Sequence, residues 1–74
     1  MTLDELQPGQ SATISYIDAD FDVRERLAAL GIKQNKNVTV IRRLHAIQIR
    51  IDHTDVIIRS DDAKRIHLGI LSIW

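Results

Sequence analysis

The most constraining feature of this 74-residue sequence is a short helical pattern that leads directly into an apolar strand pattern. Val23, Leu27 and Leu30 recur at helical spacing, so we expect them to share the face that packs against the core. Gly31 follows at the position where a left-handed residue closes a helix. Residues 37–41 then read as a β-strand. One helix over residues 22–30, in a chain that otherwise shows strand patterns, favours a small β-rich fold.

Acidic residues precede this helix and can cap its first turn. Asp20 or Asp22 can accept backbone hydrogen bonds there, and Asp22 with Glu25 has the spacing of a capping box. Asp18, Asp20 and Asp22 also alternate like the first ligands of a calcium loop, but the central glycine and the closing glutamate of that loop are missing. Capping and interaction with the helix dipole are therefore the favoured interpretation.

The remaining chain shows short strand patterns separated by turn residues. Strands are expected over residues 11–17, 37–43, 47–51, 56–59 and 65–68, with a hairpin turn at 52–55. In the first strand, alternation predicts Ala12, Ile14 and Tyr16 on one face and Thr13, Ser15 and Ile17 on the other. Single helical turns are expected before Pro8 and at 61–63, the latter capped by Ser60. These features predict a mainly β fold, a small β-barrel of about five antiparallel strands with one inserted α-helix.

Length, charge and composition exclude several classes of function. Residues 1–74 allow a single small domain. Ten basic residues balance ten acidic residues, which argues against nonspecific nucleic-acid binding. The absence of cysteine removes thiolate chemistry, and no motif of a catalytic nucleophile or phosphate loop is present, so we expect no enzyme activity and no cofactor. Neither a signal peptide nor a long apolar span is visible, which indicates a cytoplasmic protein without direct membrane insertion.

Four motifs, taken in order, resemble the FeoA family of small SH3-like proteins. They are Leu3-Asp4-Glu5-Leu6-Gln7-Pro8-Gly9, the apolar Ile14 and Ile17, Arg26-Leu27…Leu30-Gly31-Ile32, and Arg59-Ser60-Asp61-Asp62-Ala63-Lys64-Arg65-Ile66. The resemblance implies an SH3-like barrel that supports ferrous iron uptake by docking onto the cytosolic part of a FeoB-like membrane GTPase transporter, at the inner face of the membrane. Two departures stand out. Gln34-Asn35 replaces the family's Pro-Gly, although Asn tolerates positive φ, and a Pro-rich loop is missing at 43–46.

Candidate functional residues are few. The histidines His45, His53 and His67 do not have the spacing of a metal site, and His45 and His53 lie at opposite ends of one strand, about 25 Å apart at roughly 3.3 Å per residue. We therefore expect no tight metal binding by the monomer. The predicted partner-contact residues are Arg24, Arg42, Arg43, His45 and Trp74. The apolar tail that ends at Trp74 is expected to fold back over the barrel or to form a contact surface.

Three alternative functions are also compatible with the sequence. One is a metal carrier or sensor, which calorimetry with ferrous iron and zinc distinguishes. A second is the SH3-like domain of a metal-dependent repressor, which needs an attached helix-turn-helix reader that this chain, opening at Met1, is expected to lack. A nucleic-acid-binding barrel is the third, and the neutral net charge disfavours it.

Overall fold

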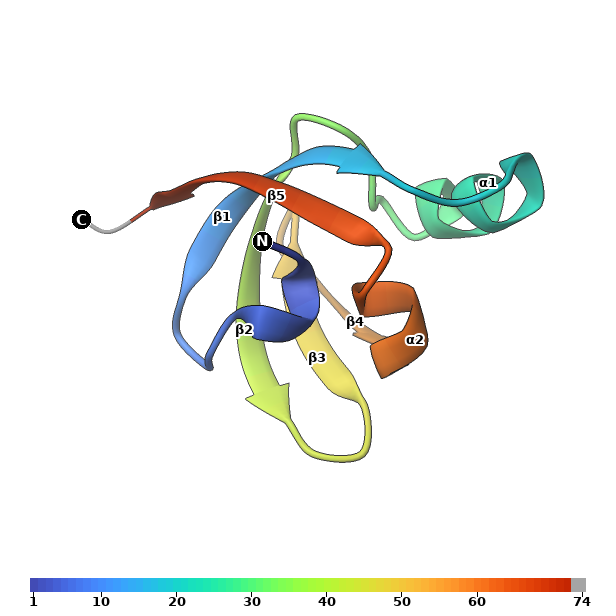
Figure 1. Cartoon of the computed structure of the whole chain (residues 1–74). Helices are drawn as coiled ribbons and strands as arrows, with labels where there is room; N and C mark the ends of the chain where they lie inside the picture. The colour runs from blue at the N-terminus through green and yellow to red at the C-terminus, as the bar shows by residue number, and fades with distance from the viewer. Residues whose placement is uncertain (73–74) are drawn as a thin grey trace.

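The computed structural model describes the backbone of residues 1–72 and the side chains of residues 1–69. In chain order its elements are η1 (Leu3–Glu5), β1 (Ser11–Ile17), α1 (Phe21–Ala29), β2 (Asn37–Arg43), β3 (Ile47–Ile51), β4 (Thr54–Ile58), α2 (Ser60–Ala63) and β5 (Ile66–Ser72). The strands form one antiparallel sheet in the order β4-β3-β2-β1-β5, which curls around the core while α1 projects to one side (Figure 1). This confirms the predicted mainly β class.

The core forms where the strand alternation predicts it. Ile47, Ile49 and Ile51 of β3 are buried, whereas Arg50 between them is exposed. The buried hydrophobic residues together are Leu3, Leu6, Ala12, Ile14, Leu27, Ile32, Val38, Val40, Ile47, Ile49, Ile51, Val56, Ile58, Ala63, Ile66 and Leu68. Because η1 and α2 contribute to this set, the two short helical turns belong to the core as well as to the connections.

The first turn of α1 is capped by Asp20. Its carboxylate accepts a hydrogen bond from the backbone N–H of Val23 at 3.0 Å, which is an N-cap interaction. Asp22 lies inside the helix, in the first turn, where its charge suits the helix dipole. The predicted Asp22–Glu25 capping box is therefore wrong, because the N-cap is Asp20 and the helix begins two residues earlier than that pair requires.

The end of α1 is closed by Gly31, as predicted, in a Schellman motif. Gly31 has φ 90°, its N–H donates to Ala28, and the N–H of Ile32 donates to Leu27 at 3.0 Å. Leu30 is the C-cap residue just before this closure, and it is 42% exposed. The prediction that Leu30 packs against the barrel is wrong. Ile32, just beyond the glycine, is fully buried instead, together with Leu27.

A β-bulge in β1 changes the orientation of Tyr16. β1 carries one more residue than β5 between the pairs Ile14–Leu68 and Tyr16–His67. Tyr16 is therefore paired with His67, outside the core, and is 51% exposed, while Ile17 packs against the core. The predicted faces are wrong for these two residues, because simple alternation does not anticipate the extra residue.

Two turns contain residues with positive φ, and a third connection leads into α2. Asn35 has φ 71°, which confirms that asparagine adopts positive φ at this turn. Asp52 and His53 have φ 50° and 66°, which is a two-residue hairpin turn, and β4 therefore begins at Thr54, two residues before the predicted start. Ser60 is the first residue of α2 and Arg59 is its N-cap, so the predicted Ser60 cap is wrong.

Candidate functional site

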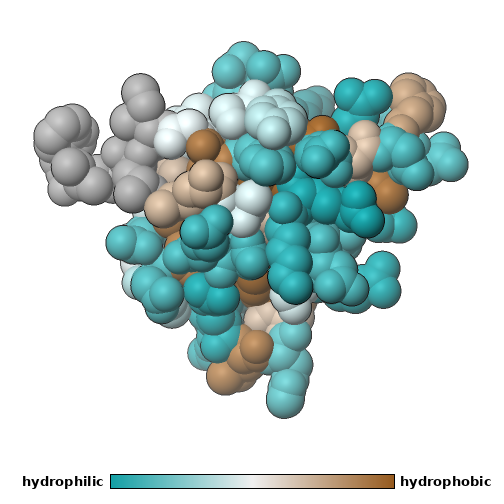
Figure 2. Space-filling model, in the orientation of Figure 1, coloured by the Kyte–Doolittle hydropathy of each residue, from teal (hydrophilic) through white to brown (hydrophobic). Residues whose placement is uncertain are grey.

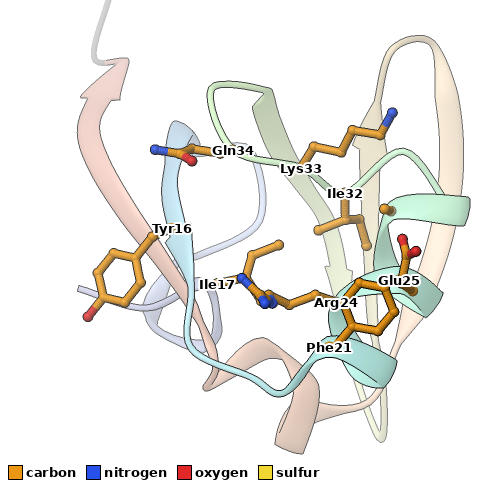
Figure 3. A pocket seen from close by; sticks show the side chains of 9 residues that line it. Tyr16, Ile17, Phe21, Arg24, Glu25, Ile32, Lys33 and Gln34 are labelled. Atoms are coloured by element: carbon orange, nitrogen blue, oxygen red, sulfur yellow. The ribbon is translucent and has the colours of Figure 1, made fainter.

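A hollow lies between the end of β1, the exposed side of α1 and the loop after α1. Its volume is about 500 Å³, and we call it the helix hollow. Its lining residues are Tyr16, Ile17, Phe21, Arg24, Glu25, Ala28, Ile32, Lys33 and Gln34 (Figure 3). Residues from three separate segments converge there because the Asp20 cap and the Gly31 closure fix both ends of α1 beside the barrel.

Two aromatic side chains at the helix hollow are exposed. Phe21, the first residue of α1, is 65% exposed, and Tyr16 is 51% exposed. The ring of Tyr16 stacks on that of His67, with the ring centroids 4.3 Å apart and the planes at 4°. Sequence reasoning missed both aromatic residues as site candidates. The available signal was their scarcity, since Phe21 and Tyr16 are two of only three aromatic residues in the sequence.

The helix hollow also presents two cationic side chains. Arg24 extends from α1 into the hollow, and Lys33 lies at its rim (Figure 3). Within residues 1–72, the ion pairs are those of Arg26 with Asp62, of Lys36 with Asp52 and of Arg50 with Asp55, so neither Arg24 nor Lys33 takes part in one. Glu25 is the acidic residue in the lining. The surface therefore combines exposed aromatic area with two cations that are available to an external anion.

The hairpin between β2 and β3 carries the other predicted contact residues. Arg42 and His45 line a smaller hollow of about 250 Å³ that also includes the exposed Leu44. Arg43 behaves differently, because its side chain is half-buried and its Nη1 donates to the backbone carbonyl of Leu6 at 2.7 Å. Arg43 thus ties η1 to β2. Trp74 lies outside the described residues.

The two basic surfaces do not form one patch. Arg24 and the hairpin residues line hollows that share no residue, and α1 lies away from the β2–β3 hairpin (Figure 1). Figure 2 shows apolar surface at both places, at the hairpin tip and beside α1, on a face that is otherwise largely hydrophilic. The predicted contact residues therefore fall on two separate surfaces, with Arg24 at the helix hollow and Arg42 and His45 at the hairpin.

No group of three or more His, Asp or Glu side chains within the described part of the chain is arranged to hold a metal ion. His53 lies in the β3–β4 turn and His45 in the β2–β3 hairpin, while His67 is stacked on Tyr16. The absence of tight metal binding by the monomer stays a prediction. We expect calorimetric titration with zinc or ferrous iron to show no one-to-one binding at micromolar concentration. Such binding, lost in His53→Ala, would contradict it.

Comparison with known proteins identifies the family. The family profile described as the FeoA domain matches residues 1–68. This chain belongs to the FeoA family. It is 35% identical over 77 residues to a Campylobacter jejuni protein named Fe(2+) transport protein A, covering 96% of this chain and all of that one. A crystal structure of Stenotrophomonas maltophilia FeoA in complex with zinc, described as a prokaryotic SH3 domain protein, matches with a TM-score of 0.82 at 24% identity, covering 93% and 89% of the two chains.

The same fold occurs within larger regulators. A manganese-dependent transcriptional repressor in complex with manganese matches with a TM-score of 0.85 at 26% identity, covering 93% of this FeoA chain but 35% of the repressor. The SH3-like fold class is thus confirmed, and so is the predicted likeness to a repressor domain. FeoA proteins are accessory transport factors, so their family also confirms that this chain is not an enzyme. No helix in residues 1–72 is long and apolar enough to cross a bilayer.

Proposed function

We propose that this FeoA protein supports ferrous iron uptake by docking onto the cytosolic part of a FeoB-type membrane GTPase transporter, with the helix hollow as its contact surface. The observation that carries this proposal is the pairing of exposed Phe21 and Tyr16 with Arg24 and Lys33 in one hollow. Membership of a family whose curated relative is named for Fe(2+) transport supplies the context.

The composition of the hollow defines the partner segment that fits it. Aromatic residues and arginine are the commonest anchors of protein interfaces, because they bury large areas and form several polar contacts. Two cations with one acidic neighbour favour a segment that brings apolar side chains beside one or two carboxylates. The complementary surface on the transporter is therefore apolar with an acidic rim.

The hairpin surface around Arg42 and His45 is the second place where the transporter can bind. It combines Leu44, which is 77% exposed, with the side chains of Arg42 and His45. It is smaller than the helix hollow, and Arg43 is engaged with Leu6 rather than free to contact a partner. We therefore place the principal contact at the helix hollow and treat the hairpin as the competing site.

Titration of the purified cytosolic domain of the cognate FeoB with this protein tests the docking. We expect saturable binding that weakens as salt increases, because the screening length falls from about 10 Å at 0.1 M to about 3 Å at 1 M. The measurement is calorimetry at low and high ionic strength, with bovine serum albumin as an unrelated acidic protein in the control titration. Absence of saturable binding at low salt would contradict the proposed partner.

A further inference from the structure

The outer edge of β4 is uncovered in the described part of the chain. β4 and β5 are the two edge strands of the sheet. The edge of β5 is covered by the N-terminal segment, through a bridge between Thr2 and His67 and a hydrogen bond from the Leu68 N–H to the Met1 carbonyl at 2.8 Å. Within residues 1–72, β4 pairs only with β3. An open strand edge is a template for pairing with another chain.

The register identifies the backbone groups that are open. The two-residue turn at Asp52 and His53 is flanked by the pair Ile51–Thr54, which is the hydrogen-bonded pair that closes such a hairpin. Hydrogen-bonded pairs alternate along an antiparallel ladder, so Thr54, Val56 and Ile58 face β3. The backbone groups of Asp55 and Ile57 point outward. Arg59 continues the extended chain, with φ −79° and ψ 153°.

The side chains of this edge form a short, ordered pattern on the exposed face. Asp55, Ile57 and Arg59 are exposed and alternate with the buried Val56 and Ile58. Ile57 is 69% exposed. Ile57 borders two hollows. One has a volume of about 640 Å³ and is also lined by the exposed Leu30, and the other is also lined by Leu44. The pattern along the edge is therefore acid, isoleucine, base.

This pattern is complementary to itself in one antiparallel register. We propose that β4 pairs with β4 of a second copy of this chain about a two-fold axis at Ile57, joining the two sheets edge to edge. The two Ile57 residues then face each other and exchange backbone hydrogen bonds. Asp55 of each copy lies opposite Arg59 of the other, and the Arg59 N–H donates to the opposite Asp55 carbonyl.

Other registers are less favourable for physical reasons. Pairing about Asp55 places two carboxylates opposite each other, and pairing about Val56 places each carboxylate opposite isoleucine. In the register about Ile57, Asp55 receives Arg59 of the second copy in addition to its own Arg50, which donates to it at 2.8 Å. These hydrogen bonds from Arg50 lower the pKa of Asp55 below its ordinary value, so the carboxylate is charged at neutral pH. The Arg59 side chain is in no ion pair within residues 1–72.

The contact is small, so the dimer is expected to be weak and dependent on concentration. Sedimentation of the full chain up to about 1 mM measures it. Wild type is expected to shift from monomer to dimer over this range. Ile57→Lys places two cations at the two-fold axis, so the concentration at which half of it is dimeric is expected to be at least about tenfold higher than for wild type. A wild type that is monomeric throughout, or an Ile57→Lys variant that dimerises like wild type, overturns the proposal.

A mixing experiment tests the register itself. Asp55→Lys and Arg59→Glu each place like charges opposite each other in the homodimer, so each variant alone is expected to weaken dimerisation about tenfold or more. A mixture of the two restores opposite charges at both ends and is expected to form the heterodimer. At one end the introduced lysine faces the introduced glutamate, and at the other the retained Arg59 faces the retained Asp55.

The control for this experiment is Asp18→Lys, an equal charge change at an exposed site away from β4. It is expected to dimerise like wild type, and circular dichroism verifies that each variant is folded. A mixture no more associated than its components contradicts the register and overturns the proposal.

Discussion

Replacing Leu27 with alanine is expected to lower the free energy of unfolding by about 2–5 kcal/mol. Leu27 is 1% exposed and is the buried residue through which α1 joins the core. Truncation removes the apolar contacts of the side chain and leaves a cavity in the core, and both effects lower the stability. A domain of this size has a stability of only about 3–5 kcal/mol, so the variant is expected to be partly or fully unfolded at room temperature.

Leu30→Ala provides the matched control for this prediction. It makes the same chemical change three residues later, but Leu30 is 42% exposed, so the expected loss is about 1 kcal/mol or less. Denaturant unfolding followed by circular dichroism compares the two variants. Leu27→Met, which preserves volume, keeps the comparison measurable if the alanine variant does not fold. Equal losses of stability for Leu27→Ala and Leu30→Ala would contradict the structure, in which Leu27 is buried and Leu30 is exposed.

Reversing the two cations of the helix hollow is expected to weaken binding to the FeoB cytosolic domain about tenfold or more. Arg24→Glu with Lys33→Glu leaves the core untouched, because both side chains are outside it and neither is in an ion pair within residues 1–72. Rim charges act mainly on the association rate and on its salt dependence. Stopped-flow or surface-based kinetics at two salt concentrations is therefore the informative measurement. The loss is expected to shrink at high salt.

Two further variants separate the possible explanations of such a loss. Lys64→Glu with Arg65→Glu makes the same change in net charge at residues that line neither hollow, so it reports the effect of overall charge alone. Arg42→Glu with His45→Glu alters the hairpin surface. Loss of binding in the hairpin variant, with retention in the helix-hollow variant, would contradict the proposed contact surface and place it at the hairpin. Phe21→Ala tests the apolar part of the hollow and is expected to act on the dissociation rate.

The segments of regular structure follow largely from local sequence. The bounds of β1, β2 and β3 coincide with the predicted strands, and Gly31 and Asn35 adopt the positive φ that their residue types tolerate. These features depend on side-chain alternation and on local backbone sterics, both of which are encoded within a few neighbouring residues. The ordered motifs that resemble FeoA have the same origin, because their glycines lie at turns and most of their apolar residues lie in the core.

The surface arrangement depends on tertiary structure. Tyr16 faces outward because β1 has one extra residue where it pairs with β5, and β5 lies far from β1 in the sequence. Arg43 is engaged because η1 brings the carbonyl of Leu6 within 2.7 Å of its guanidinium. Arg24 lies apart from Arg42 because α1 and the β2–β3 hairpin lie at separate places on the barrel. Local periodicity determined most of the side chains that enter the core, although Ile17 packs against the core and Leu30 is exposed, contrary to the pattern. Only long-range strand register determined which of the remaining ones share a surface, since that register depends on contacts between segments far apart in the sequence.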